Sequence, residues 1–128
     1  MEKVKACKLL LVENDLPSVQ VIQLALNKIC KVDVAEKGET AIDIAKHDNY
    51  DLILMDIGLG LGMNGIQTTK EIRKISGYEN TPVVAVTAYA MQGDREKFLA
   101  EGLTHYISKP FEIKALQNLI KDILESKN

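Results

Sequence analysis

The chain has 128 residues, of which 46% are hydrophobic and 27% are charged, and its formal net charge is −2. Its length and composition are those of one globular domain with its own core. The near-neutral charge and the 5% aromatic content argue against nucleic acid or an anionic membrane as a direct ligand. The apolar run at residues 9–12 is too short for a signal peptide or a membrane span. We therefore expect a single cytoplasmic domain over residues 1–128.

Five short apolar runs alternate with amphipathic stretches along the chain. The predicted strands are residues 8–13, 31–35, 51–56, 82–87 and 104–108. Three of these runs, KLLLVE, DLILMD and PVVAVT, are almost continuously apolar, which is typical of strands covered by helices on both faces.

Apolar residues at helical spacing predict three helices between or after the strands, around residues 19–29, 66–75 and 113–124. Good helix formers predict two less periodic helices, over residues 39–47 and 90–101. Gly102 then stands where a helix C-cap glycine is usual. No linker, repeat or low-complexity segment divides the chain.

The two cysteines, Cys7 and Cys30, form no CxxC motif, and His47 and His105 are far from them and from each other in the sequence. A zinc site therefore has little support. The composition favours two reduced, buried thiols, and a disulfide between them stays open.

Five βα units imply an α/β fold with right-handed crossovers. We predict a doubly wound five-stranded parallel sheet of the flavodoxin-like type, in strand order 2-1-3-4-5, with helices on both faces. In such a sheet ligands bind beyond the carboxyl ends of the strands, where the strand order reverses between the first and third strands. The function is therefore expected where those strands end.

Four of the five predicted strands lead into residues with functional chemistry. These are Glu13, Asn14 and Asp15 after the first strand, Asp56 ending the third, Thr87 and Ala88 at the fourth, and Lys109 and Pro110 after the fifth. Each has an ordinary explanation by itself, and Asp15 in particular could simply cap the following helix. The predicted fold, however, brings all of them to one end of the sheet.

Carboxylate and carbonyl oxygens suit Mg²⁺, which usually keeps several waters. A carboxylate can also attack phosphorus to form an aspartyl phosphate without a general base. A metal, a lysine and a hydroxyl could then neutralise and position the phosphoryl group. These residue types therefore fit phosphoryl acceptance at Asp56.

The chain resembles the receiver domain of two-component response regulators over essentially its whole length. The segments LLLVEND, DLILMDIGLGLGMNG, PVVAVTAYAMQGD and HYISKPF carry this resemblance, in this order and at these spacings. The segment AYAMQGDREKFLAEGLTHYISKP is also similar to receivers of hybrid histidine kinases and of single-domain phosphorelay regulators. The resemblance implies a signalling domain and not an enzyme.

The resemblance also implies a role for each residue at the strand ends. Asp56 would be the phosphoacceptor, and Mg²⁺ would be held by Glu13, Asn14, Asp56 and the main-chain carbonyl of Gly58. Four further residues would stabilise the phosphoryl group or move with the switch: Thr87, Ala88, Lys109 and Tyr106. Pro110 would fix its loop through a cis peptide bond. Tyr106 is equally well explained as an ordinary aromatic of an edge strand.

The sequence departs from the family pattern in two places. Asn14 stands where the family usually has a second acid that ligates Mg²⁺. The loop IGLGLGMNG after Asp56 is one residue longer than the common form and lacks its usual proline, which bears on the placement of the Gly58 carbonyl.

The main hypothesis is a phosphorylation-controlled switch. A histidine kinase or histidine phosphotransfer protein would donate the phosphoryl group, and the face formed by the fourth helix, fifth strand and fifth helix would contact a downstream protein. Met1 and the charged tail favour a complete protein over a receiver cut from a hybrid kinase.

Two alternatives belong to other classes. A pseudo-receiver would use the same fold as a docking module without phosphorylation; Asn14 favours it, whereas the retained Asp56, Thr87 and Lys109 argue against it. A flavodoxin-like cofactor binder would need a phosphate cradle after the first strand, where ENDLPS presents acids instead. After the first strand the sequence has neither GxxxxGK nor GxGxxG.

Overall fold

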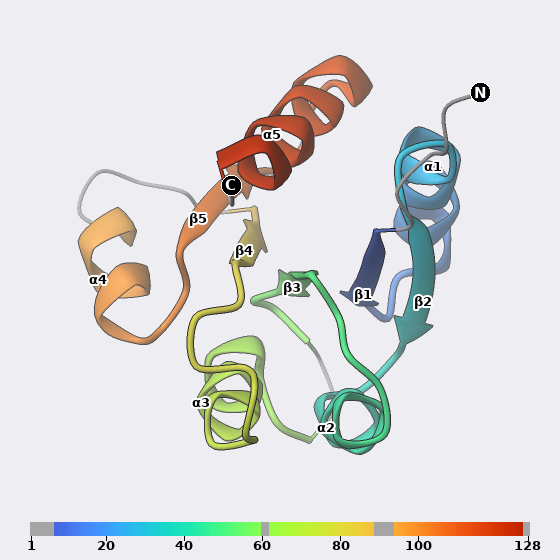
Figure 1. Cartoon of the computed structure of the whole chain (residues 1–128). Helices are drawn as coiled ribbons and strands as arrows, with labels where there is room; N and C mark the ends of the chain where they lie inside the picture. The colour runs from blue at the N-terminus through green and yellow to red at the C-terminus, as the bar shows by residue number, and fades with distance from the viewer. Residues whose placement is uncertain (1–6, 60–61, 89–93, 127–128) are drawn as a thin grey trace.

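The computed structural model describes residues 7–59, 62–88 and 94–126, in which strands and helices alternate (Figure 1). The elements are β1 (Lys8–Val12), α1 (Leu16–Leu26), β2 (Lys31–Ala35), α2 (Gly38–Lys46), β3 (Leu52–Asp56), α3 (Gly65–Arg73), β4 (Val83–Thr87), α4 (Asp94–Ala100), β5 (His105–Ser108) and α5 (Ile113–Ser126). Of the helix predicted over residues 90–101, the first four residues lie outside the described part. None of the described helices is long and apolar enough to cross a membrane.

The five strands form one parallel sheet in the order β2-β1-β3-β4-β5, which confirms the predicted fold. Helices α1 and α5 pack on one face, while α2 and α3 cover the other, and α4 lies beside the edge strand β5 (Figure 1). The sheet is therefore the middle layer of three, and its strand ends are the places where its backbone meets solvent.

The central strands are apolar along their whole length because side chains leave them towards both helical layers. Leu9 and Leu11 of β1 belong to the core under α1 and α5, whereas Leu10 and Val12 belong to the core under α2 and α3. All four are at most 1% exposed. This alternation explains why the runs read from the sequence showed no polar face.

Several strands begin or end one residue away from their predicted limits. The first strand ends at Val12, so Glu13 lies just beyond it, although the Glu13 N–H still donates to the Ala35 carbonyl at 3.0 Å. The third, fourth and fifth strands each begin one residue later than predicted. Strand periodicity defines the interior of a strand better than its first residue, because the end residues already turn out of the ladder.

Two helix ends match their sequence signals. Asp15 is the N-cap of α1, as predicted, and its carboxylate accepts from the Ser18 N–H at 3.1 Å and the Ser18 hydroxyl at 2.6 Å. Gly102, which follows α4, has a φ of +102°, a conformation that glycine adopts without strain. The predicted C-cap glycine is thus confirmed.

Gly65, the first residue of α3, lets this helix start directly against the end of β3. A Cβ atom at this position would lie 2.5 Å from the Asp56 carbonyl oxygen and 2.9 Å from Ile57 Cα. Both are backbone atoms, so neither can move without displacing the end of β3. Glycine here therefore fixes how closely α3 approaches the Asp56 main chain.

We expect Gly65→Ala to lower the free energy of unfolding by about 2 kcal/mol, because an added methyl group overpacks a backbone contact. Urea denaturation gives the measurement. Gly58→Ala is the matched control, since a Cβ at Gly58 meets only Asp56 Oδ1, at 3.8 Å. Equal losses in both variants would contradict the close-approach explanation.

Candidate functional site

Apart from Tyr106, the sequence-predicted site residues follow or end strands at the carboxyl end of the sheet. Val12 pairs with Met55 across β1 and β3, so Glu13 and Asp56, which follow these residues, are neighbours. Thr87 pairs with Ser108 across β4 and β5, which places Lys109 beside the end of β4. The Lys109 N–H donates to the Thr87 carbonyl at 2.7 Å and so fixes the start of the loop after β5.

Glu13 is only 1% exposed, although it is a carboxylic acid. Its Oε1 accepts from Lys109 Nζ at 3.2 Å and its Oε2 accepts from the Asp15 N–H at 3.1 Å. Burial, followed by a hydrogen bond with the Asp56 carboxyl and the charge of that group, raises the pKa of Glu13. The Asp15 N–H and the charge of Lys109 lower the pKa of Glu13, but by less than burial and Asp56 raise it.

Asp56 ends β3 and is 7% exposed. Its Oδ1 accepts from the Gly58 N–H at 3.0 Å and lies 3.9 Å from Lys109 Nζ. One ammonium group thus stands between two carboxyl groups and lies closer to Glu13 than to Asp56. The Asp56 carboxyl thus has a long ion pair with Lys109, one backbone donor and the hydrogen bond with Glu13.

The remaining predicted switch residues separate into buried and exposed positions. The Thr87 side chain is buried at the end of β4, next to the exposed Ala88. Tyr106 lies on the edge strand β5 and is 40% exposed. The Lys109–Pro110 peptide bond is cis, as the resemblance implies. The structure therefore brings Thr87 and Lys109 to the site, whereas Tyr106 is solvent-accessible.

Asn14 and Asp15 are both exposed, but Asp15 already has a structural task. The hydrogen bonds from the Ser18 hydroxyl and N–H lower the pKa of the Asp15 carboxyl, which keeps it ionised as the cap of α1. The predicted role of Asn14 as a metal ligand stays a prediction.

The chemistry of the carboxyl pair fits a magnesium ion. No group of three or more histidine, cysteine, aspartate or glutamate side chains in the described chain could hold a metal. Mg²⁺ does not need one, because it commonly uses one or two carboxylates and retains several waters. Burial is the largest cause of the raised pKa of Glu13, and the charge of Asp56 adds to it, while Lys109 offers only one positive charge. A divalent cation would supply the missing positive charge.

An apolar surface next to Lys109 was not predicted from the sequence. A cavity of about 480 Å³ is lined by residues of α1 and the loop after β5, among them Pro17, Val21 and Phe111. Val21 is exposed and lies outside the buried face of α1, which Val19 and Ile22 form. An apolar residue on the solvent-facing side of an amphipathic helix is the sequence feature that could have indicated this surface.

Comparison with known proteins gives the family. The model of the response regulator receiver domain matches residues 9–121. The chain is 42% identical over 89 residues to the signal transduction histidine-protein kinase BarA of Escherichia coli (strain K12), which covers 70% of this chain and 10% of that kinase. The chain thus spans about a tenth of the length of this kinase.

Two further relatives are similar over a greater share of their own length. The polar-differentiation response regulator DivK of Brucella ovis is 40% identical over 87 residues, which is 68% of this chain and 70% of DivK. A crystal structure of the receiver domain of a Pseudomonas aeruginosa PAO1 sensor histidine kinase, with a magnesium ion coordinated in its active site cleft, is 34% identical. It has a TM-score of 0.82 and covers 92% of this chain and 97% of that chain.

This chain belongs to the response regulator receiver family, and it is a receiver domain of two-component, phosphorelay-type signalling. Receiver domains are typically signalling domains without enzymatic activity of their own. The family prediction and the predicted fold are thus both confirmed.

The raised pKa of Glu13 has a consequence for stability. It means that the folded chain holds the Glu13 proton more tightly than the unfolded chain does. Stability therefore falls as pH rises from the ordinary value of 4.5 through the raised pKa, and it stays low above that pKa. In metal-free buffer, we expect Glu13→Gln to melt a few degrees above wild type near neutral pH. Below pH 4.5, the ordinary pKa of a glutamate, the difference in melting temperature between the variant and wild type should vanish.

Thermal unfolding followed by circular dichroism across this pH range is the measurement. Glu125→Gln, at an exposed position of α5, is the control and should follow wild type at every pH. A Glu13→Gln chain that is less stable than wild type at neutral pH would show that the Lys109 ion pair outweighs the burial of the carboxyl pair.

Proposed function

We propose that this receiver accepts a phosphoryl group on Asp56 with Mg²⁺ and signals through protein–protein contact. The observation that carries the proposal is the buried Asp56–Glu13 carboxyl pair with Lys109 between its members, at the carboxyl end of the sheet. A structural module would gain stability from apolar residues at these positions, because buried carboxyl groups are costly unless they are compensated.

In the proposed reaction a carboxylate oxygen of Asp56 attacks the phosphorus of a phosphohistidine. The new bond joins oxygen to phosphorus, the nitrogen–phosphorus bond breaks, and the imidazole leaves and takes up a proton. Lys109 Nζ, 3.9 Å from Asp56 Oδ1, is placed to pair with the incoming phosphoryl oxygens. The buried Thr87 hydroxyl would hydrogen-bond the same group.

The residues suited to hold Mg²⁺ are Glu13, Asn14 and Asp56, with the Gly58 carbonyl as a fourth ligand. When bound, the ion supplies positive charge that offsets the charge developing on the transferring phosphoryl group. The Gly58 N–H, which already donates to Asp56 Oδ1 at 3.0 Å, orients that carboxylate independently of the metal.

The donor would be a histidine kinase or a histidine phosphotransfer protein. The apolar surface that includes Pro17, Val21 and Phe111 lies next to Lys109, so a partner seated there would bring its phosphohistidine near Asp56. Leu16, at the start of α1, is also 63% exposed. A cytoplasmic location, where such donors act, stays a prediction.

Phosphorylation would alter the face formed by α4, β5 and α5, which we propose as the contact for a downstream protein. Tyr106 and Ile113 are exposed on this face, and Thr87 connects β4 to it through the Lys109 N–H. The added charge would bias a two-state arrangement of Thr87, Ala88 and Tyr106. The exposed position of Tyr106 is then one of its two states.

A pseudo-receiver is the second candidate function, and Asn14 is the observation that favours it. Without a second acid beside Glu13, the site could have lost its metal and become a docking module. The two functions differ in one measurable property, namely whether Asp56 becomes phosphorylated.

We expect acetyl phosphate or phosphoramidate with Mg²⁺ to add one acid-labile phosphoryl group, and Asp56→Asn to abolish this addition. Intact mass spectrometry gives the measurement. Asp122→Asn removes an exposed acid of α5 and should be phosphorylated as the wild type is. No phosphorylation of any variant would favour the pseudo-receiver, and labelling that persists in Asp56→Asn would move the site elsewhere.

The residue that faces the metal can be tested separately. We expect Asn14→Asp to tighten Mg²⁺ binding roughly tenfold, about 1.4 kcal/mol, because it adds one negative charge near the ion. Asp15→Asn should change the affinity little, and asparagine caps a helix about as well as aspartate, so α1 stays intact. The chain has no tryptophan, so isothermal titration calorimetry is the method of choice.

An unchanged affinity in Asn14→Asp would show that Asn14 does not face the metal. A large loss of affinity in Asp15→Asn would assign the metal contact to Asp15 instead.

A further inference from the structure

Cys7 and Cys30 meet at the amino end of the sheet, opposite to Asp56. Each directly precedes a strand residue, and these residues, Lys8 and Lys31, are paired in the register of β1 and β2. The Lys31 N–H donates to the Cys7 carbonyl at 2.7 Å, which ties the two chain segments together at this level. Strand pairing thus brings together two cysteines that are 23 positions apart in the sequence.

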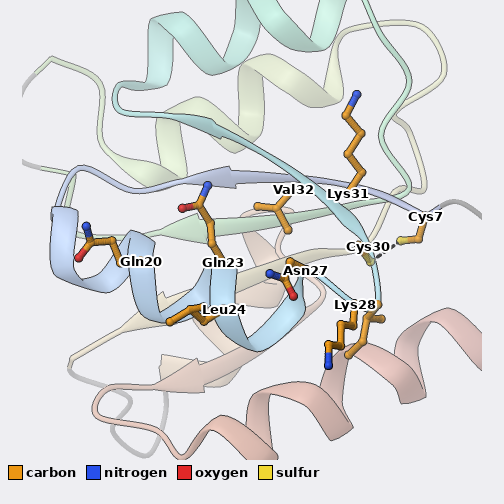
Figure 2. A pocket seen from close by; sticks show the side chains of 10 residues that line it. Cys7, Gln20, Gln23, Leu24, Asn27, Lys28, Cys30, Lys31 and Val32 are labelled. Atoms are coloured by element: carbon orange, nitrogen blue, oxygen red, sulfur yellow. Dashed lines mark hydrogen bonds between the residues drawn. The ribbon is translucent and has the colours of Figure 1, made fainter.

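Both cysteines are buried and carry thiols that are not joined in a disulfide, with exposed fractions of 6% and 4%. Their Sγ atoms lie 2.6 Å apart in a thiol–thiol hydrogen bond (Figure 2). A disulfide joins two sulfur atoms at about 2.05 Å, so bond formation needs a movement of roughly half an ångström. The folded backbone has therefore already brought the two sulfurs together.

We propose that Cys7 and Cys30 form a reversible intramolecular disulfide by exchange with a small-molecule disulfide of the oxidised-glutathione type. The thiolate of one cysteine attacks the small disulfide, which releases one small thiolate and leaves a mixed disulfide on the protein. The second cysteine then attacks the protein sulfur of this mixed disulfide and releases the other small thiolate. Two electrons pass to the small disulfide, and its two thiolates take up the two thiol protons.

The surface next to the pair suits such a reagent. A groove of about 980 Å³ is lined by both cysteines together with residues from the end of α1 and the start of β2 (Figure 2). Lys28 and Lys31 line this groove, and their positive charge would attract the carboxylates of an anionic disulfide. The polar Gln23 and Asn27 lie along the same groove.

The surroundings of the pair make the exchange slow. The hydrogen bond with Cys7, burial, and the charges of Cys7 and Asp51 raise the pKa of the Cys30 thiol. Little reactive thiolate is therefore present at neutral pH. We expect the disulfide to form under sustained exposure to oxidant, and its rate of formation to rise roughly tenfold from pH 7 to pH 8.

The disulfide would stabilise the fold without altering the site at Asp56. It closes the segment that contains β1 and α1, and a closed loop of this length restricts the unfolded chain. We expect the melting temperature to rise by roughly 10 °C on oxidation. Because the pair lies at the amino end of the sheet, labelling of Asp56 by acetyl phosphate should be equal in oxidised and reduced protein. Formation of the disulfide does not depend on the proposed function, whereas the comparison of Asp56 labelling rests on it.

The test incubates the reduced 128-residue chain with oxidised glutathione at about pH 8, where thiolate is more abundant. Intact mass spectrometry should show the loss of two hydrogen atoms without a glutathione adduct, and peptide mapping should join Cys7 to Cys30. The melting temperature should rise, and dithiothreitol should reverse both changes. Cys7→Ser and Cys30→Ser should each show no difference in melting temperature between reducing and oxidising buffer. Comparison within each variant removes any effect of the substitution itself on stability.

Three results would overturn the proposal. They are stable glutathione adducts without ring closure, disulfide-linked dimers as the only product, and unchanged free thiols after prolonged incubation. A disulfide that forms but slows Asp56 labelling would contradict the separation of the two ends of the sheet.

Discussion

The contact between the carboxyl groups of Glu13 and Asp56 is the constraint on which the site depends. Both groups are buried at the carboxyl end of the sheet, and Lys109 offers them only one positive charge. Burial first, and then the neighbouring Asp56 carboxyl, raise the pKa of Glu13. A site with uncompensated negative charge favours whatever brings positive charge, and this property makes it suitable for a divalent cation and, with that cation, for a phosphoryl group.

The fold creates this contact through strand pairing. Helices cover both faces of the sheet, so side chains inside the strands are apolar and polar chemistry is confined to the strand ends. The neighbouring strands β1 and β3 end at the same level, which leaves Glu13 and Asp56 side by side. At the other end of the sheet, the pairing of β1 with β2 brings Cys7 and Cys30 together in the same way. One parallel register thus produces two clusters with different chemistry, separated by the length of a strand.

The sequence predicted the fold well because its strongest signals are long-range averages. The apolar runs around Leu10, Ile53 and Val84 required burial on both faces, and that requirement leads to a parallel sheet with helices on each side. The placement of Asp15 as a helix cap also followed from a local rule that the structure confirms. In contrast, the closer approach of Lys109 to Glu13 than to Asp56 depends on where one long side chain settles between two carboxyl groups. The spacing of residues in the sequence cannot predict which of the two carboxyl groups lies at 3.2 Å from Lys109 Nζ and which at 3.9 Å. The exposure of Tyr106 is likewise a property of the packed edge strand and not of its sequence pattern.

Asn14 can be understood from the same charge balance. The facing groups Glu13, Asp56 and Lys109 leave one net negative charge when all three are ionised, and an aspartate at position 14 would add another. In the absence of metal, that extra charge would increase the repulsion that already raises the pKa of Glu13. Within the proposed function, asparagine therefore lowers the electrostatic cost of the metal-free receiver while it keeps a side-chain oxygen for the ion. Under the same proposal, asparagine would also weaken the attraction for Mg²⁺, so the balance between metal-free stability and metal affinity would be set at this one position. Under this proposal Asp15 would not replace the missing acid, because its carboxylate accepts from Ser18 at the start of α1.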